Sequence, residues 1–378
     1  MITREFTMKL IERFSSPCEK IQVILGPRQI GKTTGVLEFA NKVDRAIYFT
    51  ADGILSGQSS WVESCFQQAI RESKILIIDE IQKIVNWSEI IKKIWDESKI
   101  NKNGLECILL GSSSLEINRG LTESLLGRYE LINVPHWSYS ESKELSGLTV
   151  NEYLVYGGYP GSYEFIDDFD RWSHYLTTSI VDNVITKDIL LYQTVRNVSL
   201  FKQAFDIISH YPSHEISYNK LLGQIQDKGN IDIVKHYLNL YQGAFLIDVL
   251  EKYSVKPIKR KTSSPKILHR CPAFYGRLLG KRIIDESQLK GHAFETLIGN
   301  ILKNTFRKIY YWREGNYEVD FVFKYLGQEY GIEVKSGRRK SEKSKERFLK
   351  SFPEAKYFWI GTNDFESFER NPKEFLGI

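Results

Sequence analysis

A glycine-rich loop near the N-terminus constrains the fold of this 378-residue chain more than any other stretch. Residues 26–34 read GPRQIGKTT, after the apolar run IQVIL at 21–25 and before a helix-like sequence, VLEFANKV. A strand, then G-x-x-x-x-G-K-[ST], then a helix is the order in which phosphate-binding loops occur. Glycine permits backbone angles that aim several N–H groups inward, and the helix N-terminus adds partial positive charge. The loop therefore predicts a nucleotide site on a parallel α/β sheet.

The side chains of this loop have distinct expected roles. Lys32 should reach the β- and γ-phosphates of ATP, and the Thr33 hydroxyl should bind Mg²⁺. The remaining positions should form the cradle around the phosphates: Gly26, Pro27, Arg28, Gln29, Ile30, Gly31 and Thr34. ATP and Mg²⁺ are thus the predicted cofactors.

A second apolar run, KILIIDEIQ at 74–82, ends in two acids. It is typical of a buried parallel strand, and open α/β sheets bind ligands at the carboxyl edge of such strands. Asp79 fits the residue that holds Mg²⁺ through water, and Glu80 fits the base that polarises the attacking water. The alternative is a strand that ends in acids by chance, which the loop at 26–34 argues against.

The rest of the first 135 residues completes this fold. CILL at 107–110 reads as another buried strand, and the hydroxyls that follow it could touch the γ-phosphate or the attacking water. We choose Ser113 for this contact, with Ser112 almost equivalent. Strands alternate with helical stretches over 21–134, which predicts a doubly wound parallel sheet. Arg128, in ESLLGRYE, is either an arginine finger for a neighbouring subunit or a surface or capping arginine.

Composition excludes several other classes of protein. No window approaches the roughly 18–20 apolar residues that span a bilayer. The start, MITREFTMKLIERF, has no apolar core of a secretory signal, so we expect a cytoplasmic protein with no membrane partner. The four cysteines are far apart and form no C-x-x-C pair, which argues against a zinc knuckle or a disulfide framework.

Positive charge is concentrated in two stretches. The net charge of +5 is small for this length, but residues 335–350, KSGRRKSEKSKERFLK, carry eight basic and two acidic side chains. Residues 256–261, KPIKRK, form a second basic run. Each is either a solvated face or a surface for nucleic acid.

Several motifs in order resemble one family. They are GPRQIGKTT, ILIIDEIQK, LLGSSS and SLLGRY, followed by YGGYP at 156–160 and ITKDI at 185–189. Together they resemble the bacterial and archaeal AAA-type ATPases that carry a C-terminal domain of the DUF4143 kind. The resemblance implies a P-loop ATPase that often acts as a homo-oligomer. It implies no particular substrate or protein partner.

Four domains are expected along the chain. An ATPase core over 1–135 precedes a helical lid over 136–195. Residues 196–255 resemble a winged helix, with three helical sequences and then a hairpin or wing strand, GAFLIDVLEKY. Such modules bind DNA or proteins, and both remain open here. Residues 256–378 form the fourth domain.

The fourth domain contains a second ordered set of acids. Glu295 lies in an amphipathic helix, Asp320 in an alternating strand, and Glu333 and Lys335 in a further strand after a turn at Leu326-Gly327. Side chains alternate along a strand, so Glu333 and Lys335 share a face about 7 Å apart. Three carboxylates favour a hard cation such as Mg²⁺, and Lys335 would orient the nucleophile or offset transition-state charge.

This helix–strand–strand order resembles PD-(D/E)xK nucleases, close in layout to Holliday-junction resolvases. Val319 stands where a proline commonly precedes the aspartate. The basic run beside the acids, with Tyr311 and Trp312, favours nucleic acid. The alternative is a nuclease-like fold without cleavage.

Two functions are therefore expected. The first is an ATP-driven, DNA-handling enzyme, with branched DNA implied by the resemblance alone. The second is a nucleotide-dependent signalling or defence switch that binds protein partners and uses the nuclease-like fold for binding.

Overall fold

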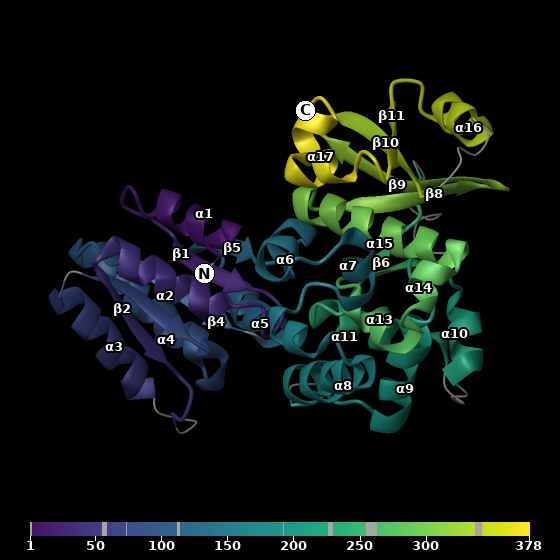
Figure 1. Cartoon of the computed structure of the whole chain (residues 1–378). Helices are drawn as coiled ribbons and strands as arrows, with labels where there is room; N and C mark the ends of the chain where they lie inside the picture. The colour runs from purple at the N-terminus through teal and green to yellow at the C-terminus, as the bar shows by residue number, and fades with distance from the viewer. Residues whose placement is uncertain are drawn as a thin grey trace. The chain divides into compact units, whose positions relative to one another are not determined.

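The chain folds into two compact units, shown in the computed structural model of Figure 1. The structure describes residues 2–54, 59–72, 74–111, 114–191, 193–225, 230–254, 263–336 and 342–378. Unit 1 comprises residues up to His136 together with Asn183–Thr194, and unit 2 comprises Trp137–Asp182 and Val195–Ile378. The predicted lid segment, 136–195, thus contributes to both units.

The described part of unit 1 contains a five-stranded sheet in the order β2-β3-β4-β1-β5, and every pairing is parallel. This confirms the predicted doubly wound α/β core. The strands are β1 (Ile21–Leu25), β2 (Ala46–Thr50), β3 (Ile75–Asp79), β4 (Cys107–Gly111) and β5 (Tyr129–Asn133). The helices are α1 (Glu5–Arg13), α2 (Lys32–Val43), α3 (Ser59–Glu72), η1 (Ile81–Lys83), α4 (Trp87–Asn101), α5 (Ser114–Glu123) and η4 (Val184–Leu190).

Strands β1, β3 and β4 are buried at every position, without the alternation of a half-exposed strand. Continuous apolar runs of this kind are expected of parallel strands that are covered on both faces. Register places the ends of the strands together: Leu25 pairs with Gly111 and with Asn133, and Thr50 pairs with Asp79. The segments that follow β1 and β3 therefore meet at the carboxyl edge of the sheet.

Unit 2 begins with helices. Two of them, α6 and α7, start at capping boxes in which Ser138 and Thr149 exchange hydrogen bonds with Glu141 and Glu152. The helices before the C-terminal sheet are α6 (Tyr139–Ser146), α7 (Val150–Tyr156), η2 (Pro160–Phe165), α8 (Phe169–Tyr175), η3 (Leu176–Val181), α9 (Val198–Ser209), α10 (Tyr218–Ile225), α11 (Ile231–Gly243), α13 (Ala273–Leu279), α14 (Arg282–Asp285) and α15 (Ser287–Thr305).

The region that resembles a winged helix has the expected elements. Helices α9, α10 and α11 contact one another. They are followed by β6 (Ile247–Leu250), which pairs antiparallel with β7 (Lys266–His269). The basic run at 256–261 lies outside the described residues.

A mixed sheet completes unit 2, with the order β11-β10-β9-β8 among the described residues. Its strands are β8 (Ile309–Glu314), β9 (Tyr317–Tyr325), β10 (Gln328–Lys335) and β11 (Lys356–Gly361), and its later helices are α16 (Lys343–Ser351), α17 (Phe365–Arg370) and α18 (Pro372–Phe375). The predicted turn between β9 and β10 is present, with positive φ at Leu326 and Gly327.

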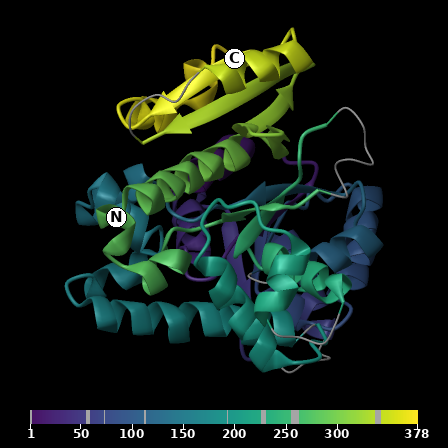
Figure 2. The same ribbon diagram turned by 90° about the vertical axis from the view of Figure 1, so that its right-hand side faces the viewer.

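The two faces of this sheet pack against different helices, as Figure 2 shows. Phe321 and Phe323 join a cluster with Phe294 and Ile298 of α15. On the other face, Val322 packs in a cluster with Phe348 of α16. Burial on both faces explains the apolar sequence of β9 and fixes the strand on which Asp320 lies.

No helix among the described residues is long and apolar enough to cross a membrane.

Candidate functional site

The phosphate loop joins β1 to α2 in unit 1. Gly31 adopts φ +84° immediately before α2, and α2 has no side-chain cap and no acid in its first turn. The N–H groups there are therefore directed toward a ligand rather than toward a capping side chain. Gly26 is required for a different reason, because a Cβ at this position would lie 2.4 Å from the carbonyl oxygen of Val134.

Lys32 is buried within this loop. Its Nζ donates hydrogen bonds to the carbonyl oxygens of Gly26 (2.9 Å) and Pro27 (2.7 Å). Burial lowers the pKa of Lys32 to about 8, and the charges of Glu80, Asp79 and Asp188 oppose that shift. A buried ammonium at the start of a helix, hydrogen-bonded to carbonyl oxygens of its own loop, fits the phosphates of a nucleotide.

The two acids after β3 lie beside the loop. Thr33 Oγ1 donates to Asp79 Oδ2 at 2.7 Å, and the backbone N–H of Glu80 donates to Asp79 Oδ1 at 2.8 Å. The hydroxyl and the carboxylate predicted to hold Mg²⁺ are thus in direct contact. These oxygen donors are the kind that Mg²⁺ binds, so the residues fit the cation.

Two residues that sequence reasoning missed orient these acids. Tyr48 on β2 donates to Asp79 Oδ2 at 3.0 Å, and Gln82 donates to Glu80 Oε2 at 2.5 Å. Burial, together with the charge of Asp79, raises the pKa of Tyr48, so the phenol keeps its proton. Glu80 itself has φ +53°, a conformation that typically costs about 1–3 kcal/mol for a residue with a side chain. Ser113 lies outside the described residues, so its role stays a prediction.

Arg28 of the loop is held from a distant part of the chain. Its guanidinium makes two hydrogen bonds to the carboxylate of Asp188, at 2.7 and 2.6 Å. Asp188 lies in η4 and its side chain is 4% exposed, whereas that of Arg28 is 25% exposed. The motif ITKDI contains this acid, but nothing in its spacing indicates the partner.

Arg128 lies at the opposite edge of the sheet. Its carbonyl oxygen accepts a hydrogen bond at 2.9 Å from the N–H of Ile21, the first residue of β1. The phosphate loop follows Leu25, the last residue of that strand. At about 3.3 Å per residue, the length of β1 separates the two by roughly 16 Å. Arg128 therefore cannot reach the phosphates of its own loop.

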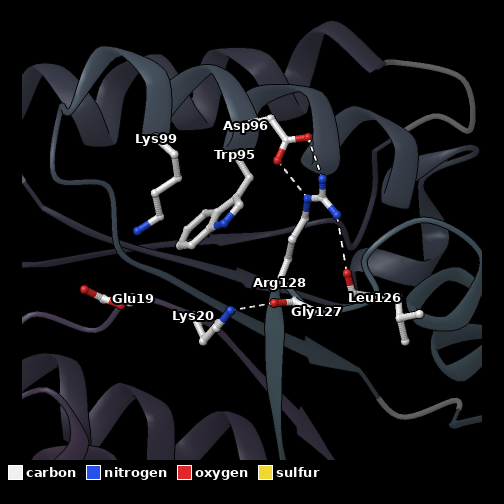
Figure 3. A pocket seen from close by; sticks show the side chains of 8 residues that line it. All are labelled: Glu19, Lys20, Trp95, Asp96, Lys99, Leu126, Gly127 and Arg128. Atoms are coloured by element: carbon white, nitrogen blue, oxygen red, sulfur yellow. Dashed lines mark hydrogen bonds and ion pairs between the residues drawn. The ribbon is translucent and has the colours of Figure 1, made fainter.

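The guanidinium of Arg128 is engaged within unit 1, as Figure 3 shows. It donates two hydrogen bonds to Asp96, at 2.7 and 2.9 Å. These hydrogen bonds hold the pKa of the Asp96 carboxyl below its usual range. The pair borders a surface hollow of about 500 Å³ lined by Glu19, Lys20, Trp95, Asp96, Lys99, Leu126, Gly127 and Arg128.

Comparison with known families agrees with this geometry. Residues 18–143 match a family described as an AAA domain. This stretch contains the phosphate loop, Asp79, Glu80 and the parallel sheet. Residues 18–143 are thus similar to AAA domains, and their parallel sheet and phosphate loop form the fold of a P-loop NTPase. Two further matches follow along the chain, to a domain of unknown function (DUF8612) over 148–283 and to another (DUF4143) over 290–372. The motifs predicted a similarity to AAA-type ATPases with a C-terminal DUF4143 region, and these matches agree with that prediction.

Sequence similarity to other proteins extends over most of the chain. The uncharacterized protein MJ1544 of Methanocaldococcus jannaschii is 25% identical, over 94% of this chain and 81% of its own length. The uncharacterized protein Rv2008c of Mycobacterium tuberculosis is 25% identical, over 83% of this chain and 70% of its own length. The Walker-type ATPase PABY2304 of Pyrococcus abyssi is a distant structural neighbour, with a TM-score of 0.49 and 16% identity over 73% of this chain and 96% of that one.

The acids predicted in the C-terminal half lie together in unit 2, apart from the AAA domain in sequence. Glu295 is on α15, Asp320 on β9, and Glu333 and Lys335 on β10. All three carboxylates are buried. Lys335 forms an ion pair with Glu333, as their shared strand face predicted, and the N–H of Val334 donates to Asp320 Oδ2 at 2.7 Å.

A lysine that sequence reasoning missed enters this cluster. Lys266 of β7 forms an ion pair with Glu295, and its Nζ lies 3.9 Å from Asp320 Oδ1. Burial opposes the charged form of Glu295, but Lys266 and His292 outweigh it and lower its pKa. Burial and the neighbouring Glu295 raise the pKa of Asp320 well above its usual range.

Two features of the predicted nuclease-like site differ from expectation. Tyr311 and Trp312 are buried, at 3% and 4% exposure, so these rings cannot stack on a base. Among the described residues, no group of three or more His, Cys, Asp or Glu side chains is arranged to hold a metal ion. The described residues thus give no support to the assignment of Glu295, Asp320 and Glu333 as Mg²⁺ ligands, and the catalytic role of Lys335 stays a prediction.

Proposed function

We propose that this chain hydrolyses ATP with Mg²⁺ and couples hydrolysis to the binding of DNA through unit 2. The observation that carries the first part is the contact between Thr33 Oγ1 and Asp79 Oδ2, with Glu80 as the next residue. This contact supports the proposal because a phosphate loop, two candidate cation ligands and a candidate base then lie at one edge of one sheet.

Each group then has a chemical role. Lys32 and the N–H groups at the start of α2 bind the phosphates, and Thr33 with Asp79 would hold Mg²⁺. The cation would neutralise charge on the β- and γ-phosphates. Glu80 polarises the attacking water, and Gln82 holds the Glu80 carboxylate through its 2.5 Å hydrogen bond.

The ATPase is proposed to work as a homo-oligomer. Arg128 lies at the amino edge of the sheet, away from its own phosphate loop, so we assign it to the site of a neighbouring subunit. To act there it would exchange its hydrogen bonds to Asp96 for the phosphates. An arginine supplied in trans can contribute about 10³-fold or more to phosphoryl transfer. The hollow beside Arg128 offers a surface for that second copy.

DNA binding is proposed for unit 2. Three helices followed by the β6–β7 pair support a winged-helix module, and α16 carries Lys343 and Lys350 on its exposed surface. Helical modules and basic surfaces of this type bind DNA phosphates. Branched DNA is the substrate that the resemblance favours. Residues 338–340 of the basic run lie outside the described residues.

The test compares ATP hydrolysis with and without DNA. We expect Mg²⁺-dependent turnover that branched DNA stimulates more than linear duplex. Absence of ATP hydrolysis under all of these conditions would reject the ATPase. ATP hydrolysis without DNA binding at low salt would instead favour the second candidate, a nucleotide-dependent switch that binds protein partners.

The basic run provides a second, independent test. Replacing Arg338, Arg339 and Lys340 by glutamine should weaken binding to all sequences alike. It should also flatten the salt dependence, which is about 0.9 log units per log unit of salt for each phosphate contact. The matched control removes the same charge from exposed lysines of unit 1, Lys92, Lys93 and Lys102, and should leave the slope unchanged.

A further inference from the structure

The carboxylates expected to bind Mg²⁺ in unit 2 already surround a cation of the protein itself. Lys266 projects from β7 into the space between α15 and β9. Its Nζ contacts the carboxylate of Glu295, and it lies 3.4 Å from the carbonyl oxygen and 3.9 Å from Oδ1 of Asp320. We infer that Lys266 is the resident cation of this cluster and takes the place that a divalent ion would need.

Burial makes this lysine an integral part of the cluster. The side chains of Lys266, Glu295 and Asp320 are only 10%, 11% and 9% exposed. A buried charge persists only when it is paired and hydrogen-bonded, so the ammonium and the carboxylates depend on one another. The position of Lys266 is also fixed, because β7 pairs with β6 and its Lys266 bridges to Glu215.

Each of the three carboxylates already accepts a hydrogen bond or forms an ion pair with another group of the protein. Glu295 has Lys266, and Asp320 accepts from the N–H of Val334 at 2.7 Å in addition to its contact with Lys266. Glu333 has its ion pair with Lys335 and accepts from the Tyr357 hydroxyl at 3.2 Å. A divalent ion would have to displace these donors and lie next to the Lys266 ammonium, which would repel it. The residues therefore do not fit Mg²⁺.

An ammonium in place of a divalent ion changes the chemistry that unit 2 can perform. An ammonium neutralises carboxylates, but it does not lower the pKa of a bound water as a divalent ion does. Unit 2 would then hold DNA without cutting it. The inference rests on the proposed DNA binding only for this last step, because ion binding is measured without DNA.

The test measures Mn²⁺ binding to nucleotide-free, full-length protein. Electron paramagnetic resonance reports the concentration of the free ion. Wild type and Asp320→Asn should bind the same amount of Mn²⁺, because wild type has no Mn²⁺ site that uses Asp320. Lys266→Ala should open a site with at least ~10-fold higher affinity, since the repelling charge is gone. Lys266→Ala/Asp320→Asn should lose that site again.

Lys303→Ala is the matched control. Lys303 is a lysine of α15 whose Nζ lies 3.3 Å from Asp248, and its side chain is 25% exposed. Its removal takes away the same charge from unit 2 and should create no Mn²⁺ site.

Two outcomes would overturn the inference. One is Mn²⁺ binding by wild type that Asp320→Asn abolishes, or Mg²⁺-dependent DNA cleavage with the same dependence. The other is a Lys266→Ala protein that has the same melting temperature as wild type, and so is folded, but gains no Mn²⁺ site. The comparison of wild type with Asp320→Asn decides the matter even if Lys266→Ala fails to fold. Failure of ATP hydrolysis or DNA binding would contradict the proposed function and leave the ion-binding result unaffected.

Discussion

Arg28 in the phosphate loop is bound through two hydrogen bonds by Asp188, a residue 160 positions further along the chain. Burial lowers the pKa of Lys32, and the charge of Asp188 partly opposes that shift. A buried carboxylate this close to the phosphate site would repel ATP unless it were neutralised. Arg28 supplies that neutralisation, and the pair joins the loop to the segment Asn183–Thr194 of unit 1.

Arg28→Ala should therefore weaken ATP binding more than the double change Arg28→Ala/Asp188→Asn. The single change leaves the Asp188 carboxylate unpaired, whereas the double change removes both charges. We expect a coupling of about 0.5–3 kcal/mol between the two positions. The measurement is the Kd of a fluorescent ATP analogue. Arg13→Ala/Glu130→Gln, a more exposed pair in the same unit, is the control, and additive effects at Arg28 and Asp188 would contradict the prediction.

Lys32→Ala and Glu80→Gln should separate binding from hydrolysis. Lys32→Ala removes the ammonium that binds the phosphates, so nucleotide binding should be lost. Glu80→Gln keeps the loop and the cation ligands but removes the base, so ATP should bind with turnover at least ~100-fold slower. Equilibrium binding and steady-state hydrolysis measured on the same preparation check both. Wild-type turnover by Glu80→Gln would show that another group activates the water.

ATP affinity should fall as pH rises above about 8, where burial places the pKa of Lys32. Phosphates bind the protonated ammonium, so above this pH binding must include uptake of a proton. The Kd should then rise by up to ~10-fold per pH unit. Lys32→Arg, whose guanidinium stays charged, should show a flat profile over the same range. A wild-type Kd that is constant from pH 7 to ~9.5 would rule out this linkage.

Arg128 should act on the ATP site of a neighbouring subunit. Arg128→Ala should lower turnover by about 10³-fold, and wild-type specific activity should rise with protein concentration. Mixing Arg128→Ala with Lys32→Ala should restore part of the activity, because some interfaces then combine an intact loop with an intact arginine. Mixing Arg128→Ala with the double variant Arg128→Ala/Lys32→Ala supplies no arginine and should restore none. Concentration-independent turnover by a proven monomer would exclude a role in trans.

The sequence by itself determined the elements that depend on local order. The glycines and Lys32 of the loop, the buried strand that ends in Asp79 and Glu80, and the alternation of strands and helices follow from backbone freedom, apolar runs and periodicity over a few residues. The shared face of Glu333 and Lys335 follows in the same way from alternation along one strand.

Only the tertiary structure decided which distant side chains meet. Asp188 binds Arg28, Asp96 binds Arg128, and Lys266 enters the acids of unit 2 because packing brings together elements that no local pattern connects. The burial of Trp312 likewise depends on α16 covering the sheet. Charge and residue type can be read along the chain, but the partner that neutralises a buried charge is set by the fold, since desolvation acts only after the surrounding elements have packed.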